Sequence, residues 1–211
     1  LIEANDIAIP EIQRPFVWKN AQVRDLMDSL YKGFPTGYII LWKNPNVKLK
    51  DGTISSGKKV VIDGQQRITA MMTAIAARKV FNSDFQQTRV KIAFNPEAAL
   101  EYEKDNDEAE IFAVQTPAHL KSKNWIADIA EIFDSQFASY SFFPQYIEAN
   151  PNISGNDLQM VLNRLRGIES TQIGVIELSD KLEIDVVTDI FIRINSKGTA
   201  LSQGDFVMSK M

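Results

Sequence analysis

The sequence predicts an α/β fold of the α+β kind with a helical insertion. Apolar runs typical of strands occur near residues 38–42, 59–62, 89–94 and 173–178. Apolar residues at helical spacing occupy 20–33, 65–76, 120–168 and 182–193. A chain of 211 residues, 45% of them hydrophobic, fits one domain. We divide it into an α/β core lobe (1–96), a helical insertion (97–170) and a return segment (171–211).

The core lobe is predicted to open with an extended segment, residues 1–18, which contains Pro10 and Pro15. A helix follows, with Asn20 expected as its N-cap and Gly33 as its C-terminal stop. Its predicted buried stripe is Val23, Leu26, Met27, Leu30 and Tyr31. A turn at 34–37 then leads into the buried strand 38–42.

Further strands of the lobe are expected at 47–49, 59–62 and 89–94. Directly after Ile62 come Asp63-Gly64 and a helical pattern that carries Ile68 and Met71. A strand, a tight glycine turn and a helix N-terminus therefore follow one another without a spacer.

Outside the lobe, the stretch 101–110 holds six acidic residues and one basic residue, Lys104. We interpret it as a solvated helix face or loop, because it lacks the Asp/Gly rhythm of a calcium-binding loop. Ser202–Asp205 resembles a capping box that would open another helix. The sequence begins with Leu1 and stops shortly after this point, so we expect an excised domain of a longer protein.

Composition excludes several classes of chemistry. Without cysteine there is no disulfide, Fe–S cluster, Cys-ligated zinc or thiol nucleophile. One histidine, His119, cannot build a His-rich zinc site or an HNH nuclease centre, and we expect it to be structural or solvated. A net charge of −4 argues against a dominant DNA-binding surface but leaves room for a local basic patch. Lacking an export signal and a long apolar run, the protein is expected to be cytoplasmic, with no membrane partner.

The strongest candidate site is the run Val60–Arg67, where a strand delivers polar groups to the start of a helix. A helix N-terminus attracts anions through its N–H groups and dipole, and Gly64 lets the backbone approach a phosphate. Asp63 can hold Mg²⁺ or orient a water molecule, and Arg67 can clamp a phosphate. The predicted site also includes Gln65, Gln66 and Thr69. In the alternative interpretation, Asp63 only caps the helix and Arg67 is a surface residue.

Two other segments carry candidate phosphate-binding residues. Gln13-Arg14 repeats the Gln66-Arg67 dipeptide, and Pro15 restricts it to an extended conformation. Arg14 would add a second guanidinium group, unless it forms a structural ion pair with Asp63. Nearby, Phe16 and Trp18 are expected in the core rather than as a stacking platform. Near the end of the chain, the candidates are Arg193, Asn195 and Lys197, which lie at a helix end and its loop. In the alternative interpretation these residues only cap that helix.

Together, three blocks resemble the N-terminal domain of GmrSD-type restriction proteins. They are Ile-Pro-x-x-Gln-Arg-Pro-Phe-Val-Trp, Ile-Asp-Gly-Gln-Gln-Arg and Arg-Ile-Asn-Ser-Lys-Gly-Thr-x-Leu-Ser, and the resemblance runs from Ile9 to Asp205. It implies a ParB/sulfiredoxin-like α/β fold with helical additions and a role in phage defence, often against modified DNA. It associates the Asp63–Arg67 motif with nucleotide binding and hydrolysis. It further implies a C-terminal HNH nuclease domain, which one histidine cannot supply here.

The leading hypothesis is a domain of a restriction or antiphage-defence protein that binds and hydrolyses a nucleoside triphosphate with Mg²⁺. Its partners would be DNA and a C-terminal nuclease domain or subunit. The first wall of the site would be Asp63–Arg67, the second Gln13 and Arg14, with Arg193, Asn195 and Lys197 closing it. The alternative is a DNA- or modified-base-binding module without nucleotide turnover. Direct DNA cleavage ranks last, because the motifs contain no evident carboxylates for a two-metal site.

Overall fold

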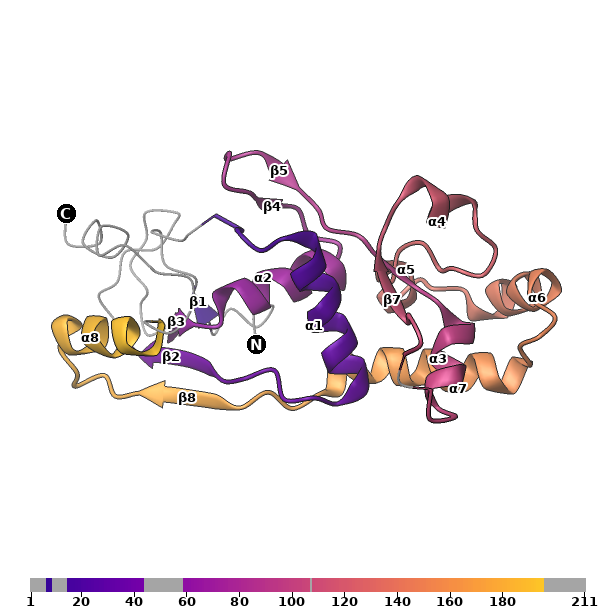
Figure 1. The fold of residues 1–211 in the computed structure, drawn as a ribbon. Coiled ribbons are helices and arrows are strands. Elements are labelled where there is room, and N and C mark those ends of the chain that lie inside the picture. The colour runs from indigo at the N-terminus through magenta and orange to yellow at the C-terminus, as the bar shows by residue number, and fades with distance from the viewer. Residues whose placement is uncertain (1–6, 9–14, 44–58, 107, 196–211) are drawn as a thin grey trace. The chain divides into compact units, whose positions relative to one another are not determined.

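The computed structural model describes residues 7–8, 15–43, 59–106 and 108–195, with only the backbone of 7–8 and 195. These residues form two compact units. Unit 1 contains 7–8, 15, 37–43, 59–65 and 173–195, and unit 2 contains 16–36, 66–106 and 108–172. Each unit is therefore assembled from segments that lie apart in the sequence, as the colours of Figure 1 show.

Unit 1 is built on a four-stranded mixed sheet in the order β1-β3-β2-β8. The strands are β1 (Ile7–Ala8), β2 (Ile39–Lys43), β3 (Lys59–Asp63) and β8 (Val175–Leu178). The central pair, β2 and β3, is antiparallel, whereas β1 pairs with β3 and β8 pairs with β2 in parallel. After β8 the chain turns and forms helix α8 (Ile184–Asn195). The sheet thus joins strands from both ends of the sequence.

The core of unit 1 lies between the sheet and α8. Val187 of α8 is fully buried against Ile40 and Trp42 of β2 and Val60 and Ile62 of β3. The Trp42 indole Nε1–H donates to the carbonyl of Ser179 at 3.1 Å, which fixes the turn between β8 and α8. Residues facing the other side of the central strands, such as Leu41, are also buried. Burial on both faces explains why these strands are continuous apolar runs in the sequence.

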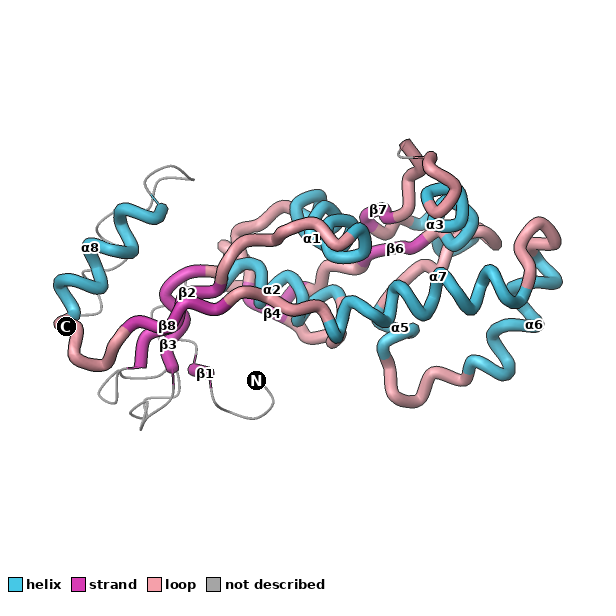
Figure 2. The backbone as a smooth tube through the Cα atoms, turned by 90° about the horizontal axis from the view of Figure 1, so that it is seen from below, coloured by secondary structure: helices cyan, strands magenta, loops and turns pink. Residues whose placement is uncertain are grey.

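Unit 2 is mainly helical. Its helices are α1 (Asn20–Lys32), α2 (Gln65–Ala74, apart from its first residue), α3 (Pro96–Tyr102), α4 (Pro117–Lys121), α5 (Ala130–Phe133), α6 (Ser139–Ala149) and α7 (Gly155–Gly167), with a 3₁₀ turn at Ile168–Ser170. Two short antiparallel pairs join β4 (Val80–Phe81) to β5 (Gln87–Thr88) and β6 (Ile92–Phe94) to β7 (Phe112–Val114). In Figure 2, α6 and α7 run in opposite directions.

An aromatic cluster holds the centre of unit 2. The rings of Tyr31, Phe94 and Phe112 lie 5.3 to 5.7 Å apart, between α1 and the β6–β7 pair. Arg164 of α7 connects to this cluster, because its Nε–H donates to the Tyr31 carbonyl at 3.1 Å and its guanidinium lies 4.9 Å from the Tyr31 ring. Fully buried α7 residues, Leu158, Val161 and Leu165, complete the core. Burial raises the pKa of the Tyr31 hydroxyl well above its ordinary value.

The α+β class is confirmed, and several predicted elements lie where the sequence placed them. In α1 the whole predicted stripe is buried, and Gly33 ends the helix with a φ of 74°. The expected N-cap was wrong, since Asn20 is the first helical residue and Lys19 occupies the cap position. The Gln22 side chain explains the shift, because its Oε1 accepts the Lys19 N–H at 2.8 Å. The expected strand at 47–49 and the helix from Ser202 fall outside the described residues.

The segment 97–170 holds most of α3 and all of α4 to α7, joined by turns and loops, together with strand β7, which pairs with β6. The sequence did not indicate β7 or the β4–β5 hairpin. The two compact units also divide the chain at other residues than 96 and 170, so the three-part division remains a prediction. Among the described residues, no helix has both the length and the apolar character needed to span a membrane.

Candidate functional site

The structure places Asp63 and Gly64 at a strand-to-helix turn, as predicted. Strand β3 ends at Asp63, whose backbone lies opposite Ile40 of β2, and α2 begins at Gln65. Gly64, between them, is buried and has a φ of 94°, in the left-handed region that favours glycine. Asp63 and Gln65 are both half-buried. This turn thus brings a carboxylate to the N-terminus of a helix of ten residues.

The side chain of Gln66 links two of the sequence blocks within unit 2. Its Oε1 accepts a hydrogen bond from the backbone N–H of Val17 at 3.0 Å, across 49 positions of sequence. The preceding residue, Phe16, is buried in the core of unit 2, and Trp18 packs against that core, as expected. The end of the first block therefore lies beside the first turn of α2, and Gln66 holds it there.

Arg67 is anchored by the turn that follows α1. Its Nη1 donates to the carbonyl of Thr36 at 2.6 Å, and the side chain is half-buried. The interpretation of Arg67 as a simple surface residue is therefore wrong. A guanidinium carries five N–H donors in a fixed plane, so this carbonyl bond fixes the orientation of the whole group. Thr69, half a turn further along α2, is also half-buried.

The other predicted site residues are described only in part. Arg193 lies on the last turn of α8, 78% exposed, and its Nη2 forms an ion pair with Asp189 at 2.8 Å. Asn195 is the final residue of α8, and only its backbone is among the described parts of the chain. Gln13, Arg14 and Lys197 lie outside the described residues altogether. The shared site formed by the three blocks consequently stays a prediction.

No group of three or more His, Asp or Glu side chains within the described ranges is arranged to hold a metal ion. An Mg²⁺ ion that binds together with a nucleotide does not need such a group of side chains. Such ions commonly use one or two carboxylates, substrate phosphates and several waters. Asp63 is the carboxylate that the strand-to-helix turn offers for this purpose.

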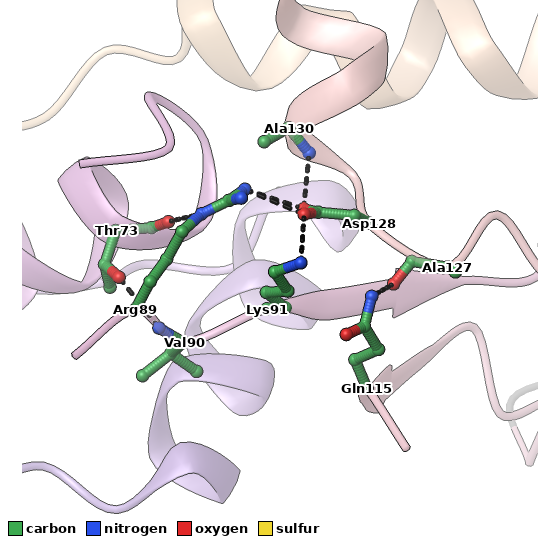
Figure 3. Close-up of polar contacts among 8 residues, drawn as sticks. All are labelled: Thr73, Arg89, Val90, Lys91, Gln115, Ala127, Asp128 and Ala130. Carbon is green, nitrogen blue, oxygen red and sulfur yellow. Dashed lines mark hydrogen bonds and ion pairs between the residues drawn. The ribbon is translucent and has the colours of Figure 1, made fainter. Parts of the chain in front are cut away.

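A second polar cluster, not predicted from the sequence, lies between α2 and α5 in unit 2 (Figure 3). The carboxylate of Asp128, 4% exposed, accepts from Arg89 Nη2 at 2.9 Å and from the Ala130 N–H at 3.2 Å. The hydroxyl of Thr73 on α2 accepts the Val90 N–H at 2.9 Å. Desolvation, and then the charge of Asp128, raises the pKa of Glu131. Because each buried group has a partner, we interpret this cluster as structural.

His119 has a structural role, as its isolation in the sequence suggested. Its Nδ1 accepts the backbone N–H of Thr116 at 3.0 Å at the start of α4. Its ring lies 4.7 Å from the ring of Trp125. The histidine therefore caps a short helix and packs on an aromatic side chain.

Comparison with known proteins relates the chain to a family and to an archaeal protein. The family model described as "GmrSD restriction endonuclease, N-terminal domain" matches residues 1–211. An uncharacterized protein of Methanocaldococcus jannaschii is 25% identical over an alignment covering 97% of this chain. The same alignment covers 39% of the archaeal protein, so this chain spans about two fifths of the length of that relative.

Proposed function

Because the chain belongs to the family of GmrSD restriction endonuclease N-terminal domains, we propose that it binds and hydrolyses a nucleoside triphosphate with Mg²⁺. In this proposal, nucleotide turnover regulates a restriction or antiphage-defence protein that acts on DNA, including modified DNA. A C-terminal nuclease domain or subunit would cut the DNA, since the lone His119 of this chain serves a structural role.

The observation that carries the proposal is the turn from β3 through Gly64 into α2. Backbone N–H groups in the first turn of a helix have no partner within the helix, and the helix dipole adds partial positive charge. The φ of 94° at Gly64 permits a sharp turn that most side chains would strain. A phosphate group bound here would meet N–H donors from the backbone, with Asp63 one residue away for the metal.

Each residue of the motif has a proposed role. Asp63 would hold Mg²⁺, directly or through water, and the ion would supply positive charge that neutralises the phosphate oxygens. Gln65 or Gln66 orients the attacking water, because an amide both donates and accepts hydrogen bonds. Arg67, oriented by Thr36, contributes positive charge in the ground state and the transition state.

The test is steady-state phosphate release from the four nucleoside triphosphates, with Mg²⁺ and with a chelator, alongside nucleotide-dependent thermal shifts. Asp63→Asn should lower kcat more than nucleotide affinity, because the metal acts mainly on the transition state. Arg67→Ala should weaken both. Asp180→Asn removes an exposed carboxylate elsewhere in unit 1 and should leave both unchanged.

Thermal melts separate this proposal from a purely structural motif. If Asp63 only caps α2, Asp63→Asn will lower the melting temperature without a specific loss of turnover. Wild-type kcat from folded Asp63→Asn protein would remove the catalytic role. If the wild type binds the nucleotide but does not hydrolyse it, the domain is a regulatory binding module.

A further inference from the structure

We propose that the β4–β5 hairpin of unit 2 contacts DNA, with the Phe85 side chain stacking on a base and Arg78 and Lys79 binding phosphates. The inference rests on the proposed action on DNA and names the surface that performs it. It concerns a part of the molecule that the nucleotide motif does not use. In Figure 1 the hairpin projects from the body of unit 2.

The hairpin has a well-defined tip. Asn82 and Gln86 face each other across a three-residue loop, and the Asn82 N–H donates to the Gln86 carbonyl at 3.0 Å. The Asn82 side-chain oxygen accepts the backbone N–H groups of Asp84 and Gln86 at 3.0 and 2.9 Å. These bonds fix the backbone that presents Phe85.

Phe85 occupies the one loop position where an aromatic residue is least expected. Its φ is 57°, and the left-handed position of a three-residue hairpin loop is ordinarily glycine or asparagine. The side chain is also 78% exposed, so packing does little to offset the backbone cost. An observed backbone outlier with an exposed aromatic side chain points to a binding role.

The second Phe of the hairpin, Phe81, is 44% exposed. Its carbonyl accepts the Phe16 N–H at 2.8 Å, which ties the base of the hairpin to the first sequence block. The exposed aromatic tip is therefore attached to the same segment that Gln66 holds beside α2.

Charge identifies the partner as a polyanion. Residues 64–96 contain five basic side chains and one acidic side chain, Asp84, although the whole chain has a net charge of −4. Two of the five, Arg67 and Arg89, are bound to Thr36 and Asp128. Arg78 and Lys79 are exposed in the connection between α2 and β4, directly before the first strand of the hairpin. Aromatic side chains beside basic ones form the usual surface for stacking on bases while contacting the phosphate backbone.

The experiment is a fluorescence-anisotropy titration of the whole chain against a labelled single-stranded oligonucleotide and its duplex, over a series of salt concentrations. Phe85→Ala should weaken binding about tenfold, the loss typical of one stacked base. Phe85→Trp should retain the affinity, because a larger ring still stacks. Tyr140→Ala is the matched control, since Tyr140 is 84% exposed on α6 of the same unit and should be dispensable.

Replacing Arg78 and Lys79 together by alanine should reduce the salt dependence of binding. For single strands, the slope of log K against log salt should fall by about 0.7 for each phosphate that the variant no longer binds. The form of DNA bound more tightly shows whether the tip stacks on an unpaired base or enters a duplex.

Phe85→Ala protein that binds DNA as tightly as the wild type would overturn the inference. So would a change in sedimentation with unchanged DNA affinity, which would make the hairpin a protein-binding surface. If the wild-type chain binds neither the single strand nor the duplex, both the proposed action on DNA and this inference are refuted. Absence of nucleotide turnover, by contrast, would refute the hydrolytic function and leave a Phe85-dependent DNA affinity intact.

Discussion

The substitution Asp128→Ala removes a carboxylate from the interior of unit 2 and leaves its partners in place. Arg89 loses a charged acceptor at 2.9 Å, and the buried Ala130 N–H loses its acceptor at 3.2 Å. Lys91, 3.9 Å away and 45% exposed, remains solvated. The perturbation therefore acts on one ion pair and one backbone hydrogen bond.

Its magnitude follows from these interactions. Breaking a fully buried ion pair by removing one partner costs about 3–5 kcal/mol, because a charge stays buried without compensation. The Arg89 side chain is 21% exposed and can recover part of its hydration, so about 2 kcal/mol applies here. The unsatisfied Ala130 N–H adds about 1 kcal/mol. We expect a loss of about 3 kcal/mol, which lowers the melting temperature of a chain this size by about 6–12 °C.

Urea denaturation followed by circular dichroism, together with thermal melts, would measure this loss. Asp128→Asn keeps an oxygen for the Ala130 N–H and should lose only about 2 kcal/mol. The control is Glu148→Ala, which removes an exposed carboxylate from helix α6 of the same unit. If Asp128→Ala stays within about 0.5 kcal/mol of the wild type, the cluster in Figure 3 does not stabilise unit 2.

Three further predictions address the pH dependence, the core and a helix end. Folding raises the pKa of Glu131, through desolvation and then through the charge of Asp128. Protonated Glu131 therefore adds to the stability of the folded protein below the ordinary glutamate pKa, and this contribution is lost as pH rises through the raised pKa. Glu131→Gln should remove this pH-dependent loss in melts recorded from about pH 4 to about pH 8, and an unchanged pH profile would contradict the shift. Leu165→Ala, at a fully buried position, should cost about 3 kcal/mol in urea denaturation, and a cost below about 1 kcal/mol would mean that α7 is loosely packed. Gly33→Ala meets no atom within 4 Å but has a φ of 74°, so it should cost about 1–2 kcal/mol by thermal melt, through the backbone alone.

The sequence predicted those elements whose signal is local. The stripe of α1 repeats at helical spacing and is followed by Gly33, and both features survive in the structure. Likewise, a continuous apolar strand before Asp63-Gly64 and helical spacing after it located the turn from β3 to α2. The position of Asp63 in the candidate site could therefore be predicted from neighbouring residues.

Features that depend on distant residues could not be predicted. Arg67 finds its acceptor 31 positions away, and Arg89 pairs with Asp128 across 39 positions. The β4–β5 hairpin escaped prediction because its strands are two residues each and partly polar. Strand β7 is only three residues long, and its pairing with β6 across an acidic segment has no local signature.

The place of β8 in the sheet of unit 1 has a consequence for the newly synthesised chain. Trp42 of β2 and Ser179 after β8 are hydrogen-bonded in the folded protein but 137 positions apart in the sequence. At translation speeds of about 5–20 residues per second, the ribosome needs roughly 10 s to cover that distance. During this interval β2 and β3 can pair, while the other edge of β2, within an Ile-Ile-Leu-Trp run, has no strand with which its N–H and C=O groups can form hydrogen bonds. Because all of unit 2 is translated before residue 173, that unit can fold first, and the edge of β2 stays open to pairing with other chains until β8 has been made.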